Sequence, residues 1–381
     1  MFVNDASNTG NLLSAVGAVY SPHRISGDLA WAVTVGAAIM ALGRPALERY
    51  TRTWNWLGVL ARTFAEARDP SLSWLDDSTL VWGTQIMLQT PPDLRGGWKA
   101  DEVELALSRS VFKLDTHHTA AYRKFVKVQN SLDPQRIASR SPKYGIARNP
   151  SSFSDNPALR LEIHETEYAN IVFFKDIVAR DPAQLTKFAQ AAVTDNHIKF
   201  PNNLALHAVV ATRDGKLLLT RRSPKVEYFP KSWSCSIEEQ LAARDLEPDD
   251  GGAMSRWVVR MLVEELGFQR STLEQWYDED ARILGVILEA AVPNCGLIGL
   301  VHLHCDSETL TQILRTHPRT DYEFDEFDFV EWSGIAGELI HPTRNYHPTS
   351  GIRMLMAGIA HDGPAPFMKR LVDARIATMR H

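Results

Sequence analysis

The stretch RWVVRMLVEELGF, Arg256 to Phe268, sets two adjacent carboxylates at the end of a helical pattern. At about 100° per residue, its apolar side chains fall on one broad face, and Glu265 falls near the centre of that face. Glu264 falls at the edge, one turn after Arg260. A buried carboxylate is costly unless it is paired, hydrogen-bonded or bound to a metal. The pattern therefore predicts either an exposed helix end or a cation beside Glu265.

The elements around this helix are predicted from local patterns. The helix itself runs from about Ala253 to Leu266 and is stopped by Gly267. LALHAVVATRDGKLLLTRR predicts a hairpin around Asp214-Gly215. After the helix, the chain predicts two strands, a helix, an acidic strand and a last helix; their sequences are ARILGVILEAAV, GLIGLVHLHCD, SETLTQILRTH, YEFDEFDFVEW and HPTSGIRMLMAGIA.

The acidic strand has a change of phase. Asp321, Glu323 and Asp325 alternate onto one face, and Glu326 and Asp328 alternate after a shift that indicates a bulge. Two interpretations stay open. Glu323 or Glu326 could serve a site, or the charges could protect a solvated edge strand from aggregation.

Length and composition limit the class of protein. The 381 residues are enough for two or three domains, and 44% hydrophobic with 23% charged residues is typical of a globular protein. A net charge of −5 does not indicate a duplex nucleic-acid surface, so we expect no nucleic-acid partner. Three cysteines favour neither a disulfide scaffold nor a metal cluster, and we expect a cytoplasmic protein.

The chain divides into three parts by residue composition and hydrophobic pattern. Residues 1–130 are predicted to form a mainly helical N-terminal domain, 131–160 a linker or long loop, and 161–381 the α/β part, with its core at about 203–360. The uncharged run from Leu29 to Gly43 is shorter than the ~20 residues of a membrane span, so we interpret it as a buried helix.

The order of the elements predicted from Asn203 to about Trp332 resembles the Nudix hydrolase fold. That order is a hairpin, a Trp-containing loop, the carboxylate helix, two strands, a helix and the acidic strand. That family has a characteristic box whose second half is matched here by Arg260, Leu262, Glu264, Glu265, Gly267 and Phe268. The resemblance implies an α/β/α sandwich in the C-terminal half, beside the mainly helical N-terminal region.

The sequence also departs from the box. Met261 stands where the family has a glutamate after the arginine, and Gly252 where it has an earlier one. The paired glycines that open the box are replaced around Cys235-Ser236, and an insertion from Leu241 to Asp250 separates the two halves. Fewer carboxylates imply weaker metal binding or fewer metals.

The resemblance implies a site and its chemistry. Family members cleave or bind a nucleoside diphosphate joined to another group, using Mg²⁺ or Mn²⁺ held by hard oxygen ligands. Carried over residue by residue, Glu264 and Glu265 are the metal ligands and Arg260 is their structural partner. Glu239 is the preferred replacement for the missing carboxylate, with Glu238 as the alternative.

Other side chains are candidates for the substrate. Arg221 and Arg222 could hold phosphates bidentately, although one of them is expected to be only a surface charge, and Trp233 or Tyr228 could stack on a base. Cys235 lies near the proposed site without a histidine placed to activate it, so we interpret it as a small packed residue.

We therefore predict a metal-dependent Nudix-type pyrophosphohydrolase, in which water attacks phosphorus. The alternative is a catalytically weakened nucleotide-binding sensor coupled to the N-terminal region. A weaker third interpretation is a prenyl diphosphate isomerase, for which Cys235 is the only support. The expected partner is a small nucleotide, without membrane insertion, and the N-terminal region leaves a homo-oligomer or a protein partner open.

Overall fold

We describe the protein from a computed structural model. All described residues belong to one compact unit that begins at Arg52. The described residues are 75, 79–114, 116–132, 142–150, 158–178, 180–195, 197–226, 228–247, 252–278, 280–290, 294–316 and 323–378. The predicted buried helix from Leu29 to Gly43 and most of the predicted linker lie outside them.

Two sheets organise the described residues. The strands of the larger sheet are β1 Val81–Trp82, β2 Gln85–Gln89, β3 Trp98–Lys99, β7 Leu204–Ala211, β8 Lys216–Arg222, β9 Trp233–Ser234, β10 Ile237–Gln240, β11 Ala281–Glu289, β12 Asn294–His302 and β13 Phe324–Glu331. Their order is β1-β2-β11-β12-β7-β8-β13, with β3 beside β11, β10 beside β7 and β9 beside β8. The smaller sheet has the order β4-β6-β5, from β4 Val103–Val111, β5 Lys143–Ile146 and β6 Leu159–Thr166.

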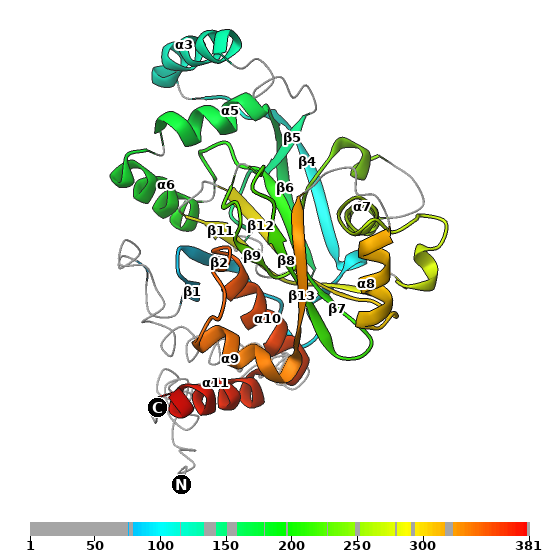
Figure 1. Ribbon diagram of the computed structural model, residues 1–381. Coiled ribbons are helices and arrows are strands. Elements are labelled where there is room, and N and C mark those ends of the chain that lie inside the picture. Colours follow the sequence, from blue (N-terminus) through cyan, green and yellow to red (C-terminus); the bar gives the residue numbers. More distant parts are fainter. Residues whose placement is uncertain are drawn as a thin grey trace, which may run out of the picture. The chain divides into compact units, whose positions relative to one another are not determined.

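Helices cover both faces of the larger sheet (Figure 1). The α-helices are α3 Thr116–Leu132, α5 Tyr168–Phe173, α6 Pro182–Thr194, α7 Ala253–Leu266, α8 Ser307–Thr316, α9 Ile335–Ile340, α10 Ser350–Asp362 and α11 Pro364–Thr378. The shorter helical segments are η3 Ala100–Glu102, the π-helical η5 Phe174–Val178, η6 Ala243–Asp245, η7 Leu273–Gln275 and η8 Trp332–Gly334. None of the helices among the described residues combines the length and the apolar character needed to cross a membrane.

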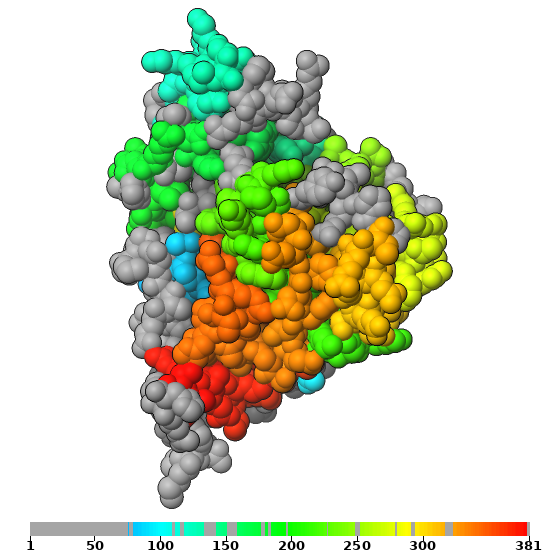
Figure 2. Space-filling model, viewed as in Figure 1, coloured from blue at the N-terminus to red at the C-terminus, as the bar shows by residue number. Residues whose placement is uncertain are grey.

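The buried side chains form two cores, one on each face of the larger sheet. Along β7, Leu206 and Ala208 belong to one core, whereas Val209 and Ala211 belong to the other. The first core is covered by α7, α8 and the smaller sheet, and the second by α9, α10 and α11. In Figure 2, the last three helices form one area of the surface, from orange to red. Because both faces are covered, β7 is apolar throughout except for His207.

The order of elements expected from the resemblance is present, so the Nudix-like α/β fold is confirmed. Helix α7 has the predicted bounds, and Gly267 ends it in the left-handed region, with φ of 72°. Strands β7 and β8 form the predicted hairpin, and β13 shifts register between Phe324 and Glu326, where the bulge was predicted.

The described part of the N-terminal region is only partly helical: α3 agrees with the expectation, and the segment before it does not. Between Val81 and Val111 it forms strands: β2 pairs with β11, and β4 pairs in parallel with β6. Apolar runs as short as QIMLQ do not distinguish a strand from a helix, so pairing with β11 decides. Whether residues 1–130 make a domain of their own stays a prediction, since most of the first 79 lie outside the described residues.

Candidate functional site

A pocket of about 860 Å³ lies at the carboxylate end of α7. The smaller sheet, α5 and η5 contribute to its lining, through Lys143, Tyr168 and Lys175 respectively. Its volume lies in the range of pockets that enclose a small-molecule ligand. The predicted site residues that line it are Arg222, Glu239, Arg260, Glu264 and Glu265.

Arg260 is the centre of an ion-pair network on the pocket wall. Its guanidinium donates to both oxygens of Asp245, at 2.8 and 2.7 Å, and lies 2.9 Å from Glu239 and 3.0 Å from Glu264. Burial acts to lower the pKa of Arg260, but the bonds and charges of Asp245 and Glu239 raise it above its usual value. Arg260 therefore holds the inserted loop as well as the predicted partner Glu264.

The two adjacent carboxylates of α7 have different surroundings. Glu264 is partly exposed and accepts bonds from Arg260 and from Arg244, the latter at 2.5 Å. Glu265 is only 7% exposed, and no hydrogen bond or ion pair of its carboxylate is found among the described residues. Burial, followed by the charges of Glu323, Glu239 and Glu238, raises the pKa of Glu265 well above its usual value, and Arg222 opposes this.

A small cavity joins three carboxylates at this point. It measures about 10 Å³, and Glu238, Glu265 and Glu323 line it together with Arg222. That volume is close to what one water-sized sphere requires. Glu238 and Glu323 thus share this cavity with Glu265, whereas Glu239 and Glu264, the companions expected, line only the larger pocket.

The donor set fits a hard divalent cation. Carboxylate oxygens are the ligands that Mg²⁺ and Mn²⁺ prefer, and the charge of a cation would offset the cost of burying Glu265 without a partner. As they are placed, however, the His, Cys, Asp and Glu side chains of the described residues include no group of three that already converges as metal ligands. Glu265, Glu323 and Glu238 line the same small cavity, and Glu238 would have to exchange its ion pairs with Arg353 and Arg222 for a bound cation.

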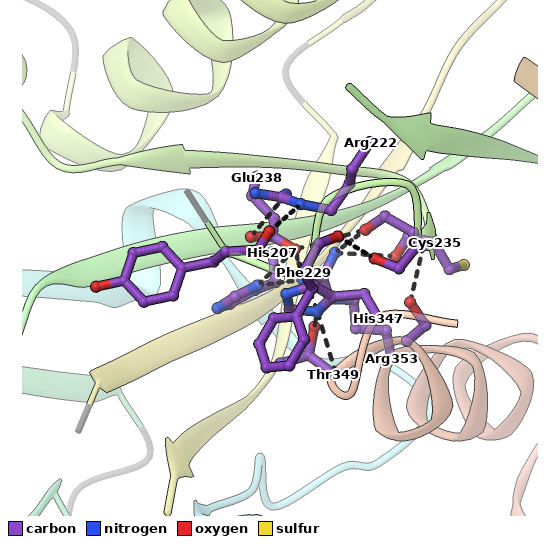
Figure 3. Close-up of polar contacts among 12 residues, drawn as sticks. His207, Arg222, Phe229, Cys235, Glu238, His347, Thr349 and Arg353 are labelled. Atoms are coloured by element: carbon purple, nitrogen blue, oxygen red, sulfur yellow. Dashed lines mark hydrogen bonds and ion pairs between the residues drawn. The ribbon is translucent and has the colours of Figure 1, made fainter. Parts of the chain in front are cut away.

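Glu238 belongs to a buried cluster on the floor of the pocket (Figure 3). Fully buried Arg353 of α10 donates to Glu238, to His207 Nδ1 and to Ser234 Oγ. Arg222 lies 3.4 Å from the same carboxylate. Burial alone would raise the pKa of Glu238, but Arg353, His347 and Arg222 hold it well below its usual value. Glu238 is thus ionised at neutral pH.

Two histidines complete this cluster. Arg353 can only donate, so Nδ1 of His207 accepts and the ring proton lies on Nε2, 3.5 Å from Glu289. His347 contacts the edge of the Phe229 ring, at 4.8 Å between centroids, and shares a hydrogen bond with Thr349 (Figure 3). Burial lowers the pKa of His347 to about 4, so it is neutral at physiological pH.

Two candidate substrate residues lie outside the pocket lining. Arg221 pairs with Glu326 on the exposed side of β8 and β13, and Trp233 packs against the second core with Arg344 over its ring. Tyr228 and Phe229 line the pocket in place of Trp233. Cys235 is fully buried, and burial raises its thiol pKa to about 12, which fits the packed residue that was expected.

The sequence interpretation missed His207, Glu289, His347 and Arg353. They come from β7, β11, the segment before α10, and α10, so no local spacing links them. The available signal was a single polar residue inside an apolar element, as in LALHAVV for His207 and GIRMLMAG for Arg353. A lone buried polar side chain needs a partner, but the sequence does not name that partner.

Known proteins resemble part of this chain in structure. No protein family and no curated protein matches the sequence. A Nudix hydrolase from Alicyclobacillus acidocaldarius is 14% identical, covers 44% of this chain and 94% of its own, and has a TM-score of 0.31. A MutT protein from Methanosarcina mazei Go1 is 15% identical over 44% of this chain and 94% of its own, with a TM-score of 0.26.

A third similar structure is a bifunctional NMN adenylyltransferase/ADP ribose pyrophosphatase from Francisella tularensis, in complex with AMP and a manganese ion. It is 12% identical, and the match covers 50% of this chain and 49% of that one, with a TM-score of 0.26. These similarities concern the fold of part of the chain. The function proposed next rests on the side chains of the site.

Proposed function

We propose that this protein hydrolyses a nucleoside diphosphate joined to another group, with water attacking phosphorus and with Mg²⁺ or Mn²⁺ as cofactor. The observation that carries the proposal is Glu265, a buried carboxylate without a partner among the described residues, beside Glu238 and Glu323 in a pocket of nucleotide size. A divalent cation, when bound, offsets phosphate charge and makes water more acidic.

Different side chains of the pocket have different roles in this proposal. Glu265 and Glu323, with Glu238, would hold the cation, while Arg260 keeps Glu239 and Glu264 in place on the wall. Arg222 lines both cavities and is the best-placed cation for phosphate oxygens. Lys143 adds a second positive charge to the pocket lining, where it donates to Gln240 and where burial lowers its pKa.

The ligand set of the proposal therefore differs in part from the set read from the sequence. Glu264 and Glu239 remain candidates, but both are engaged by Arg260, and Glu264 also by Arg244. Release from these ion pairs would have to precede any binding of a cation by Glu264 or Glu239. The uncompensated charge of Glu265 supports it as the ligand common to both sets.

The experiment is metal-dependent turnover on a panel of nucleotide sugars, dinucleotide polyphosphates and nucleoside triphosphates. We expect Glu265→Gln and Glu323→Gln each to lower kcat at least about 100-fold, since each removes a cation ligand. Glu326→Gln is the matched control close to Glu323 in the chain, because Glu326 pairs with Arg221 and is not among the residues that line the pocket. Equal rates in all three variants would refute the proposal.

A second candidate is a nucleotide-binding sensor without turnover. Met261 favours it, because this residue is fully buried in the first core at the position of a family carboxylate. Nucleotides that raise the melting temperature of the wild type without being cleaved, with either metal, would support this candidate. The proposed partner is in both cases a small nucleotide in the cytoplasm, and an oligomer or protein partner through residues 1–130 stays a prediction.

A further inference from the structure

His347 lines the pocket, and the hydrolysis proposed above gives it no role. It lies shortly before helix α10, whose N-cap is Thr349, and only 3% of its surface is exposed. Its ring contacts Phe229 on one side and Thr349 on another (Figure 3). A polar ring that is almost buried, yet belongs to the lining of a pocket, has few atoms available to a ligand, so the state of each ring nitrogen matters.

One nitrogen of the ring is an acceptor. The backbone N–H of Thr349 donates to His347 Nδ1 at 3.3 Å, and the Thr349 hydroxyl lies 2.8 Å from the same nitrogen. An imidazole nitrogen that accepts a hydrogen bond carries no proton, so the ring proton lies on Nε2. The N-terminus of α10, with its partial positive charge, lies beside the acceptor and thereby strengthens Nε2–H as a donor.

The Nε2–H donor is open to the pocket. It has no hydrogen-bond partner in the part of the chain that the structure describes, and it is not one of the fully enclosed polar atoms that lack a partner there. It therefore keeps contact with the pocket that His347 lines. A nearly buried donor that stays unpaired costs free energy, so a ligand that brings an acceptor to this place would be favoured.

The neighbours of the ring place this donor close to the acidic cavity. His347 Nδ1 is 3.6 Å from Glu238 Oε1, and Arg222 Nη1 is 3.4 Å from Oε2 of the same carboxylate. Glu238 and Arg222 both line the small acidic cavity as well as the larger pocket. A single carboxylate thus separates His347 from the arginine proposed for phosphate oxygens, and both donors flank the place proposed for the diphosphate.

The Phe229 ring packs against His347 from a strained part of the backbone. Phe229 has φ of 47°, in the left-handed region, which is costly for a residue other than glycine. Ser232 Oγ donates to the Phe229 carbonyl at 2.7 Å, and Arg222 Nε donates to the Tyr228 carbonyl at 3.1 Å, so the turn is fixed. Strain that is held in place at a pocket wall indicates that the position of the two rings serves binding.

We propose that His347 is a substrate-binding residue, which donates a hydrogen bond from Nε2 to a phosphate oxygen of the bound diphosphate. The inference rests on the proposed function, since it assigns a further contact to the same substrate. A phosphate oxygen is an ionised acceptor, and hydrogen bonds to ionised acceptors are the stronger ones. Arg222 supplies charge and His347 a directed N–H, so together they would fix the orientation of the diphosphate.

The test measures the binding of a diphosphate that water does not cleave. Methylenediphosphonate is titrated with Mg²⁺ present against the wild type, His347→Leu and His347→Gln, by calorimetry. We expect His347→Leu to weaken binding at least about tenfold, because a bond to a charged oxygen is lost. His347→Gln restores an N–H donor on a side chain of similar reach and should stay within about threefold of the wild type.

Two controls separate phosphate recognition from other effects. His341→Leu, at an exposed position outside the pocket lining, is the matched control and should bind methylenediphosphonate as the wild type does. Adenosine, guanosine, cytidine and uridine are titrated in parallel, because they offer the acceptors of a base and a sugar without a phosphate. Melting temperatures of all variants identify any that fail to fold.

Three outcomes overturn the inference. The first is that the wild type does not bind methylenediphosphonate, and the second is that His347→Leu binds it within about twofold of the wild type, including the case in which only a nucleoside binds less well. The third is an equal loss in His347→Leu and His347→Gln, which would give the ring a structural role. Binding that depends on His347 without any turnover would contradict the proposed hydrolysis alone, and turnover with binding that ignores His347 would contradict this inference alone.

Discussion

Arg260 of α7 donates two parallel hydrogen bonds to Asp245 of the inserted loop, at 2.8 and 2.7 Å. Both side chains are nearly buried, with 10% and 2% of their surfaces exposed. Asp245 also accepts from the backbone N–H of Ala242, so it closes its own turn. The insertion that interrupts the family's box is thus attached to the residue that orients the carboxylates.

Asp245→Ala should destabilise the protein strongly. It leaves the buried Arg260 guanidinium with fewer partners, and removing one member of a buried ion pair costs about 3–5 kcal/mol. Chemical denaturation measures the change. Asp278→Ala, at an exposed residue that pairs with His304, is the control and should stay within about 0.5 kcal/mol of the wild type. A loss as small as the control's would show that the loop is not held by this pair.

Glu265→Gln should stabilise the metal-free protein in a pH-dependent way. The folded-state pKa of Glu265 is raised above its ordinary value of 4.5, so its stabilising contribution is present below that value and is lost as pH rises through the folded pKa. Wild type and variant should therefore melt together at about pH 4, and the variant should melt higher at about pH 8. Thermal melting in EDTA gives the comparison.

The same series with Mg²⁺ distinguishes a cation site from simple burial. Bound cation should raise the melting temperature of the wild type at neutral pH and leave Glu265→Gln nearly unchanged, because binding to the folded state alone adds stability. Glu274→Gln serves as the exposed control. If Mg²⁺ raises the melting temperature of Glu265→Gln as much as that of Glu274→Gln, the cation binds elsewhere.

Two neighbouring arginines should behave differently. Arg222→Gln is expected to weaken the binding of nucleotide phosphates about tenfold, because Arg222 lines both cavities and lies beside Glu238. Arg221→Gln removes the surface pair with Glu326 and a hydrogen bond to the Lys231 carbonyl, and it should leave the Kd within about twofold of the wild type. Equal losses in the two variants would contradict the assignment of Arg222.

Gly296→Ala should disturb the floor of the pocket. The added Cβ would overlap the His207 ring, so His207 must move away from Arg353 and Glu289 at a cost of about 1–3 kcal/mol. Gly337→Ala is the matched control, because its Cβ would meet no atom within 4 Å. Gly337 lies in helix α9, where alanine should raise the free energy of unfolding by about 0.5–1 kcal/mol. Chemical denaturation measures the free energy of unfolding of both variants. If Gly296→Ala is as stable as Gly337→Ala, the His207 ring moves aside without a cost.

Local features of the site's framework were predictable from sequence because they depend on neighbours along the chain. The amphipathic period and Gly267 define α7, and Asp214-Gly215 defines the β7–β8 hairpin. The phase change in the acidic strand predicted the bulge of β13. The strands between Val81 and Val111 were not predictable, since β2 and β4 depend on distant partners.

The sequence by itself determined that Glu265 lies on the apolar face of α7, because the helical period fixes the direction of its side chain. Only the tertiary structure decided which groups surround it. The packing of α10 against the sheet sets Arg353 beside Glu238, across 115 positions of the chain, and strand register sets Glu289 beside Asn294. Ion pairs and hydrogen bonds act between atoms a few ångströms apart, and that separation is fixed by the packing of the sheet and its helices rather than by spacing along the chain.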